Sequence, residues 1–301
     1  MSTSYLDKKK RQFTLGKLGA WLFLGIILFF SLFPVFWMLR TALSPNSNLF
    51  SSELNLFPDG MSLNNFKRIL GLATLEEAQA MGGSGASLNF LLYLWNSIKF
   101  TLTIVLGTVT FAVFGGYALA RLNFRGRNAI FFILMSGLLV PGMFATIPNF
   151  ILIIKLHLLN TFMGSVAPFV FGTPFAVFFM RQFFLSFPKE IEEAAELDGL
   201  GVFARLRKIV VPMSLPPIFT LSLITGVTAW NEYLWPYLVS NDENKRVLTV
   251  GLRVFLSQSP STAPDWAGLM AATTMTIIPV IIILAVFGKK MIGSIQLAGF
   301  K

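Results

Sequence analysis

Residues Ala20 to Leu39 read AWLFLGIILFFSLFPVFWML and contain no charged side chain. A helix needs about 20 mostly apolar residues to cross the hydrocarbon core of a bilayer, and this stretch has that length. Five more stretches of similar character follow, at Ser97–Leu119, Ala129–Ile153, Gly164–Phe184, Leu215–Leu238 and Trp266–Gly288. The sequence therefore predicts an all-α membrane protein with six transmembrane helices. Pro141 and Gly142 are expected to break the third of them.

The composition agrees with this prediction. The chain is 54% hydrophobic and 13% charged, whereas soluble domains carry about 25% charged residues. Its 301 residues include no cysteine, which excludes disulfides, cysteine nucleophiles and thiolate metal sites. The single histidine, His157, cannot form a multi-histidine metal site. We therefore expect no metal site and interpret His157 as an exposed loop residue.

The first apolar stretch raises the question of a cleaved signal peptide, because basic residues precede it. Its apolar run exceeds the 7–15 residues of a signal-peptide core. The best candidate for a cleavage site, Ala42-Leu43-Ser44, is followed by Pro45, which makes it a poor one. We expect the stretch to be retained as the first transmembrane helix.

The net charge of +10 is distributed unevenly between the two sides of the membrane. Six spans place both termini on one side, together with 16 of the 24 Lys and Arg residues. The short loop after the second span alone carries Arg121, Arg125 and Arg127, and short loops count most in the positive-inside rule. Both termini are therefore expected in the cytoplasm. Since the residues on the other side are neutral overall, the positive-inside rule accounts for the whole positive net charge. Nucleic-acid binding is therefore not predicted.

These spans divide the chain into three parts. A cytoplasmic N-terminal segment covers 1–19, the six-span domain covers 20–288, and a cytoplasmic tail covers 289–301. Within the domain, long outer loops cover 40–96 and 239–265, and a cytoplasmic loop covers 185–212. Neither outer loop is large enough for a catalytic domain, and both suit contact with an external partner.

Catalytic motifs are missing from the sequence. It contains no Gly-x4-Gly-Lys-Ser/Thr phosphate loop, so the chain is not expected to hydrolyse ATP by that route. No Ser-His-Asp arrangement forms around His157, and no span contains neighbouring carboxylates. The chain is therefore predicted not to be an enzyme.

The most specific segment is the cytoplasmic loop after the fourth span. Pro188 suits the first position of a helix, and Glu190, Glu192 and Glu193 suit the positive end of its dipole. Gly199 fits a left-handed C-terminal cap. Ala194 and Ala195 leave a small surface between these ends. The pattern predicts a short amphipathic helix that another protein can approach closely.

The spacing in this loop resembles that of a known family. Glu193-Ala194-Ala195 is followed after three residues by Gly199, after nine more by Ile209, and then by Val211-Pro212. This looks like the EAA loop of ABC importer permeases, Glu-Ala-Ala-x3-Gly-x9-Ile-x-Leu-Pro, and it departs only at Val211, where Leu is usual. Tyr117–Arg121 and Trp230–Pro236 resemble stretches of the carbohydrate-uptake group. The two long outer loops are most similar in layout to those of the smaller, six-span permease of maltose-type importers.

The resemblance implies a type I ABC importer permease fold in the bacterial cytoplasmic (inner) membrane. The loop would be the coupling helix that docks on an ATPase subunit. The implied ATPase-coupling residues are Glu193, Ala194, Ala195, Asp198, Gly199, Ile209 and Pro212. This chain would bind no cofactor, because ATP and Mg belong to the ATPases. The implied partners are a second homologous permease, two ATPase subunits and an extracytoplasmic solute-binding protein, in addition to membrane lipid.

The transported molecule and its contacts are less well defined. The resemblance implies a carbohydrate, with an oligosaccharide favoured, but names no substrate-binding residue in this chain. Asn231 and Glu232 are candidates for lining the translocation path, because an ionisable residue within a span is a functional candidate. Glu232 also lies near the outer end of its span, where it can simply reach water. Two alternatives are an ion-gradient-driven secondary transporter, for which no internal repeat was found, and a structural scaffold.

Overall fold

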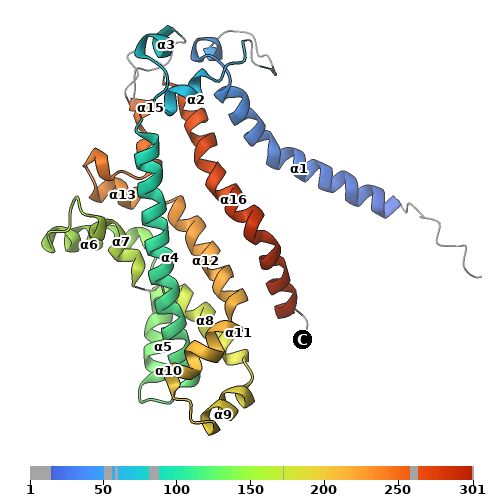
Figure 1. Cartoon of the computed structure of the whole chain (residues 1–301), viewed down its shortest axis with the longest axis vertical. Coiled ribbons are helices and arrows are strands. Elements are labelled where there is room, and N and C mark those ends of the chain that lie inside the picture. The colour runs from blue at the N-terminus through green and yellow to red at the C-terminus, as the bar shows by residue number, and fades with distance from the viewer. Residues whose placement is uncertain are drawn as a thin grey trace, which may run out of the picture. The chain divides into compact units, whose positions relative to one another are not determined.

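Figure 1 shows a computed structural model of the chain, which describes residues 15–50, 56–57, 60–80, 88–171, 173–257 and 264–299. Every regular element in these residues is a helix, as predicted. The chain divides into two compact units. One comprises residues 1–85 and 258–274, and the other comprises residues 86–257 and 275–301.

The longest element of the first unit is α1 (Leu15–Ala42), which contains the first predicted span and begins five residues before it. None of the residues in its most apolar window is buried. Phe29, Phe33 and Trp37 follow one another along one face, with ring centroids about 6 Å apart. At its C-terminal end Thr41 and Ala42 are buried, and Phe36 contacts Phe57. The long, exposed apolar part of the helix is suited to lipid or to another membrane protein.

Polar contacts organise the rest of the first unit. Its short helices are η1 (Asn46–Phe50), α2 (Asn64–Ile69) and α3 (Leu75–Ala80). The Asn65 side-chain amide donates to the carbonyl oxygens of Ala42 and Ser44, both at 2.9 Å. Arg68 Nη1 lies 2.8 Å from Asp265 Oδ2. Asp265 also accepts from the Gly268 amide, so the same carboxylate caps α16 (Trp266–Gly299).

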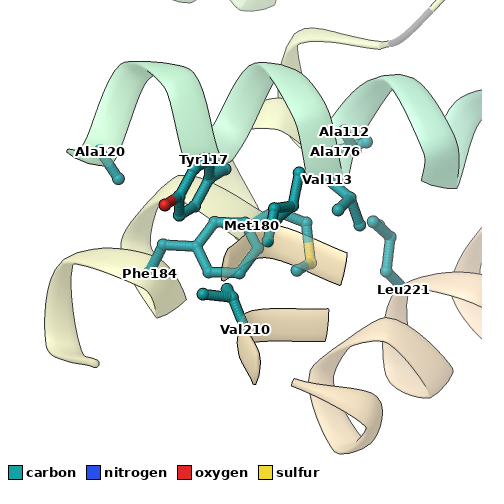
Figure 2. Close-up of a cluster of buried hydrophobic side chains, with 10 residues drawn as sticks. Ala112, Val113, Tyr117, Ala120, Ala176, Met180, Phe184, Val210 and Leu221 are labelled. Atoms are coloured by element: carbon teal, nitrogen blue, oxygen red, sulfur yellow. The ribbon is translucent and has the colours of Figure 1, made fainter. Parts of the chain in front are cut away.

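The second unit is built around α4 (Phe90–Arg121). This helix packs against α7 (Phe162–Val170), α8 (Pro174–Ser186) and α12 (Leu215–Trp230). Figure 2 shows the buried cluster near the end of α4, where Tyr117, Met180 and Phe184 pack together with Val210 and Leu221. Met180 and Phe184 are fully buried.

A glycine brings α4 and α8 into close contact. A Cβ at Gly116 would lie 2.8 Å from Met180 Cβ and 2.9 Å from the Arg181 amide nitrogen. Neither a Cβ nor a backbone atom can swing aside as the tip of a flexible side chain can. Small residues commonly allow such backbone approach between membrane helices.

Within the described residues, three helices are long and apolar enough to span a membrane, α1, α4 and α16, or up to six spans if each bent helix pair counts as one. The third predicted span consists of α5 (Arg127–Ser136), η2 (Gly137–Leu139) and α6 (Gly142–Lys155), with a bend of 103°. Pro141 immediately precedes α6, which confirms the predicted break. The fourth corresponds to α7 and α8. The other bent pair joins Val202–Met213 to α12 at 78°.

The fifth predicted span, Leu215–Leu238, was wrong as a continuous helix. It is divided into α12 and α13 (Leu234–Val239). The Asn231 side chain donates to the Val227 carbonyl, while the Glu232 carboxylate accepts from the Trp235 amide at 3.1 Å. These side chains satisfy backbone groups at the two new helix ends.

The remaining helices lie in the two predicted loops. The loop predicted to be cytoplasmic forms α9 (Lys189–Leu197), α10 (Val202–Arg205), the π-helical turn η3 (Leu206–Val210) and α11 (Val211–Met213). The last outer loop forms η4 (Glu243–Lys245), α14 (Leu248–Gly251) and α15 (Val254–Ser257). α16 continues to Gly299, so the predicted tail 289–301 begins inside a helix.

Candidate functional site

The short amphipathic helix expected from the sequence is present as α9. Pro188 is the residue before the helix, with φ −59° and ψ 127°, rather than its first residue. Glu190 and Glu192 lie in the first turn, where carboxylates interact favourably with the exposed amide groups.

The C-terminus of α9 is closed by a complete Schellman motif. The Leu200 amide donates to the Ala195 carbonyl at 3.0 Å, and the Gly199 amide donates to the Glu196 carbonyl at 2.9 Å. Gly199 has φ +82°, the left-handed conformation that this motif needs. A Cβ at Gly199 would meet nothing within 4 Å, so glycine is required here for its backbone conformation and not for space. This confirms the predicted cap.

The two faces of α9 differ in exposure. Ala195 is 4% exposed, and Glu192 is also buried. Glu193, Ala194 and Asp198 are exposed, and Leu197 is 90% exposed. The exposed face thus combines carboxylates, a small residue and one large apolar side chain that is almost fully exposed. Of the three residues of the Glu-Ala-Ala motif, only Ala195 faces inward.

Glu192 fixes the buried face of α9 to the end of α4. Tyr117 donates its hydroxyl hydrogen to Glu192 Oε2 at 2.8 Å, and Arg121 Nε lies 3.1 Å from Glu192 Oε1. Arg121 also donates to the Phe187 carbonyl, in the turn before α9. The Arg121 and Glu192 side chains are 7% and 11% exposed. The carboxylate is therefore paired and hydrogen-bonded, as a buried charge has to be.

A second ion pair ties α9 to the helix that follows. Arg205 in α10 pairs with Glu196. The Arg205 side chain is mostly buried, whereas Glu196 is mostly exposed. Together the two ion pairs fix α9 to the end of α4 and to α10, which begins the series of short helices that leads into α12.

Ile209 and Pro212, the last two residues implied for the coupling loop, lie further along the chain. Ile209 is half-buried in η3, and Pro212 is exposed in α11. Pro212 has no amide hydrogen, so it cannot complete the helical hydrogen bonding of the preceding turn. The π-helical turn directly before it is a common form of local adjustment. These two residues shape the entry into α12 and are not part of the exposed face of α9.

The sequence analysis did not predict the contacts of Glu192 with Arg121 and Tyr117. It also did not predict the contact of Arg205 with Glu196. Tyr117 and Arg121 are four residues apart on a helix, which places them on one face. This spacing could have been read from the sequence. The sequence does not show which of Glu190, Glu192 and Glu193 is buried, because only the packing of α9 decides that.

Asn231 and Glu232, the candidates for the translocation path, are close in sequence but make separate contacts. Asn231 is exposed and bonds within α12, while Glu232 is half-buried and caps α13. Thr249 donates its hydroxyl hydrogen to the Glu232 carbonyl at 2.7 Å. Glu232 therefore has a clear structural role at the junction of α12, α13 and α14.

No group of three or more His, Cys, Asp or Glu side chains suitable for a metal ion occurs in the part of the chain that the structure describes. His157 is exposed, with φ 55°, just after α6. The organised polar groups of the site are instead those that hold α9 in place.

Comparisons with known proteins agree with this geometry. The sequence model of the family described as binding-protein-dependent transport system inner membrane component matches residues 109–291. The arabinooligosaccharides transport system permease protein AraQ of Bacillus subtilis is 30% identical over 292 residues, which cover 96% of this chain and 98% of that protein. The sn-glycerol-3-phosphate transport system permease protein UgpE of Yersinia pestis is 30% identical over 262 residues, 87% of this chain and 89% of that one.

The fold has a counterpart among solved structures. A chain of a bacterial ABC transporter involved in the import of the acidic polysaccharide alginate superimposes with a TM-score of 0.77. The two chains are 24% identical, and the match covers 96% of this chain and 99% of the other. This likeness establishes the ABC importer permease fold.

The family match covers more than half of the chain and includes all of α9. It decides against a secondary transporter and against a scaffold, and it identifies a permease and not an ATPase. The chain belongs to the binding-protein-dependent transport system inner membrane components, and it is a permease subunit of a binding-protein-dependent ABC importer.

Proposed function

We propose that the exposed face of α9 is the docking surface for an ATPase subunit and transmits ATP-driven movement into the membrane helices. The observation that carries this proposal is the contrast between the two faces of α9. One face is held by Arg121 and Tyr117 through Glu192, and the other presents Glu193, Ala194 and an almost fully exposed Leu197. A force applied to a helix fixed in this way reaches α4 through a short, buried contact.

The proposal assigns different roles to the implied coupling residues. Glu193, Ala194 and Asp198 contact the ATPase, Ala195 packs beneath them, and Gly199 ends the helix. Ile209 and Pro212 pass the movement to α12. Two ATPase copies bind ATP and Mg, a second homologous permease completes the membrane part, and a solute-binding protein delivers the substrate outside.

The topology is part of the same proposal. Each bent helix pair counts as one span, which gives six spans with both termini in the cytoplasm and a type I importer architecture. The parts are the N-terminal segment 1–19, the membrane domain 20–288 and the tail 289–301. The outer loops 40–96 and 239–265 then face the solute-binding protein, and 185–212 faces the ATPase.

The substrate we propose is a carbohydrate, with an oligosaccharide favoured. Two of the relatives compared above are named for arabinooligosaccharides and for sn-glycerol-3-phosphate, which are both polyhydroxylated solutes. Asn231 and Glu232 are proposed to line part of the path, in addition to the structural role of Glu232.

The test combines co-purification with an ATPase assay. Leu197→Asp places an unpaired charge at the centre of the proposed interface and is expected to weaken ATPase binding about tenfold or more. Glu193→Lys should also reduce it. Glu76→Lys is the matched control, because Glu76 is an exposed residue of α3 in the first outer loop.

Unchanged ATPase binding in both α9 variants would contradict the coupling role. Ala195 is not a useful position for this test, because it is buried and a charge there would disturb folding. Stimulation of ATP turnover by one solute-binding protein with one sugar would identify the substrate.

A further inference from the structure

A hollow of about 330 Å³ lies in the second unit, along the first turns of α4. Arg121 and α9 are at the other end of α4, so the hollow lies away from the coupling surface. Its lining includes Asn96, Lys99, Phe100, Phe162, Asn244 and Lys245. The volume is in the range of small-molecule sites, about 300–1,000 Å³.

The walls of the hollow are held by long-range hydrogen bonds. The Asn96 side-chain amide donates to the carbonyl oxygens of Asn244 and Arg246 at 2.8 and 3.0 Å. The Leu248 amide donates to Ser97 Oγ at 2.8 Å. Asn96 is 8% exposed. The last outer loop is therefore fixed to α4, and the hollow is a built feature of the fold.

The hollow has a surplus of positive charge. Lys245 Nζ donates to the Asn160 carbonyl at 2.5 Å and lies 3.3 Å from Asp242 Oδ2. A hydrogen bond from the Asn244 amide and the neighbouring Lys245 lower the pKa of Asp242, so this carboxylate balances Lys245 at neutral pH. Lys99 is exposed and forms no ion pair within the described residues. One positive charge therefore remains for an anionic group.

The position of Lys99 along α4 matches the edge of a bilayer. At 1.5 Å per residue, Lys99 lies about 33 Å from Arg121, close to the hydrocarbon thickness of about 30 Å. Trp95, one turn before Lys99, is 58% exposed, and its ring centroid is 5.9 Å from Lys99 Nζ. Exposed Trp beside Lys is typical of the membrane–water interface.

Below Lys99 the same face of α4 is apolar and uncovered. Leu102 and Leu106 are 54% and 67% exposed, and they follow Lys99 by three and seven residues, which keeps them on one side of the helix. A ligand at this place therefore meets a cation at the interface and apolar side chains beneath it. A soluble anion would use only the first of these features, whereas a phospholipid uses both.

We propose that the hollow binds the phosphodiester headgroup of an anionic phospholipid, phosphatidylglycerol, with one acyl chain lying along Leu102 and Leu106. Lys99 pairs with the phosphate, and the Phe162 side of the hollow covers the glycerol. The topology proposed above assigns this lipid to the outer leaflet. Lipid binding itself is measured without transport, so its failure is separate from a failure of the coupling proposal.

The experiment titrates phosphatidylglycerol into the delipidated full-length chain in detergent and counts bound lipids by native mass spectrometry. Lys99→Gln is expected to weaken binding about fivefold, the effect of one lysine near an anionic lipid surface. Lys155→Gln is the control, since it removes one charge from the last turn of α6 at a position that does not line the hollow. Leu106→Gln should also weaken binding, and it tests the acyl-chain contact without touching Lys99.

Four results would overturn the proposal. If Lys99→Gln and Lys155→Gln bind phosphatidylglycerol equally, Lys99 does not form a headgroup site. If phosphatidylcholine binds as well as phosphatidylglycerol, the site has no preference for an anionic lipid. Displacement of the lipid by an excess of inorganic phosphate or glycerol 1-phosphate would identify a site for a soluble anion. Loss of the lipid when the chain assembles with a second permease would show that this surface is a protein interface.

Discussion

Arg121 Nε lies 3.1 Å from Glu192 Oε1, and this buried pair joins the last turn of α4 to the first turn of α9. The two residues are 71 positions apart in the sequence, yet the pair is the most direct charged contact between a long membrane helix and the proposed docking helix. Because the pair is buried and joins these two helices, its loss should affect both the stability of the protein and the coupling of ATP hydrolysis to uptake.

Arg121→Met is expected to destabilise the protein by about 3 kcal/mol or more, because it leaves a buried carboxylate without its cation. Glu192→Gln removes the charge but keeps an oxygen for the Tyr117 hydroxyl, so its effect should be smaller. The double variant should lose less stability than the sum of the two single losses. Thermal unfolding in detergent measures all three, and additive losses would contradict the pairing.

The same pair should matter for coupling. In the assembled transporter, Arg121→Met is expected to retain basal ATP hydrolysis by the ATPase subunits while stimulated uptake falls, because α9 is no longer fixed to α4. Uptake and hydrolysis that fall in parallel would instead indicate lost assembly.

The left-handed conformation of Gly199 gives a second prediction. Gly199→Ala is expected to cost about 1–2 kcal/mol, the penalty for an L side chain at positive φ. Gly199→Asn should cost less, because Asn tolerates this conformation. The control is Gly201→Ala two residues later, where φ is −66° and a Cβ meets nothing within 4 Å. Equal thermal stability of the Ala variants at 199 and 201 would contradict the cap.

Much of this architecture follows from local sequence signals. Apolar runs predicted the long helices α1, α4 and α16, Pro141 marked the start of α6 after the break, and Gly199 marked the end of α9. Each of these signals determines the structure of the residues next to it in the sequence. That is why the sequence alone was sufficient for them.

The missed features depend on contacts between distant residues or on polar caps inside apolar runs. The division of the fifth span arises from Asn231 and Glu232, which a count of apolar residues does not register. The contact of Arg68 with Asp265 connects two predicted outer loops and orders the first of them around α2. Helix periodicity carries no information about such pairs.

Close helix packing gives a third prediction, with a control in the adjacent residue. Gly116→Ala places a methyl group 2.8 Å from Met180 Cβ, so α4 and α8 must move apart at a cost of about 1–3 kcal/mol. At Gly115 the nearest atoms are Val177 methyl groups at 3.5 Å, an ordinary contact. Gly115→Ala should therefore be close to neutral. Thermal unfolding of the two variants in detergent tests the difference, and a larger loss at 115 would refute the packing argument.

The absence of cysteine makes the proposed topology directly measurable, because every introduced thiol is the only one in the chain. Met61→Cys places a thiol in the first predicted outer loop and Leu197→Cys places one on α9, where the native side chains are 64% and 90% exposed. If six spans place the termini in the cytoplasm, a membrane-impermeant maleimide added to intact spheroplasts labels Cys at position 61 only. Permeabilised spheroplasts should be labelled at both positions, and the parent chain at neither. Labelling at position 197 in intact spheroplasts would place α9 outside, beyond the reach of an ATPase in the cytoplasm, and would refute the topology and the coupling role together.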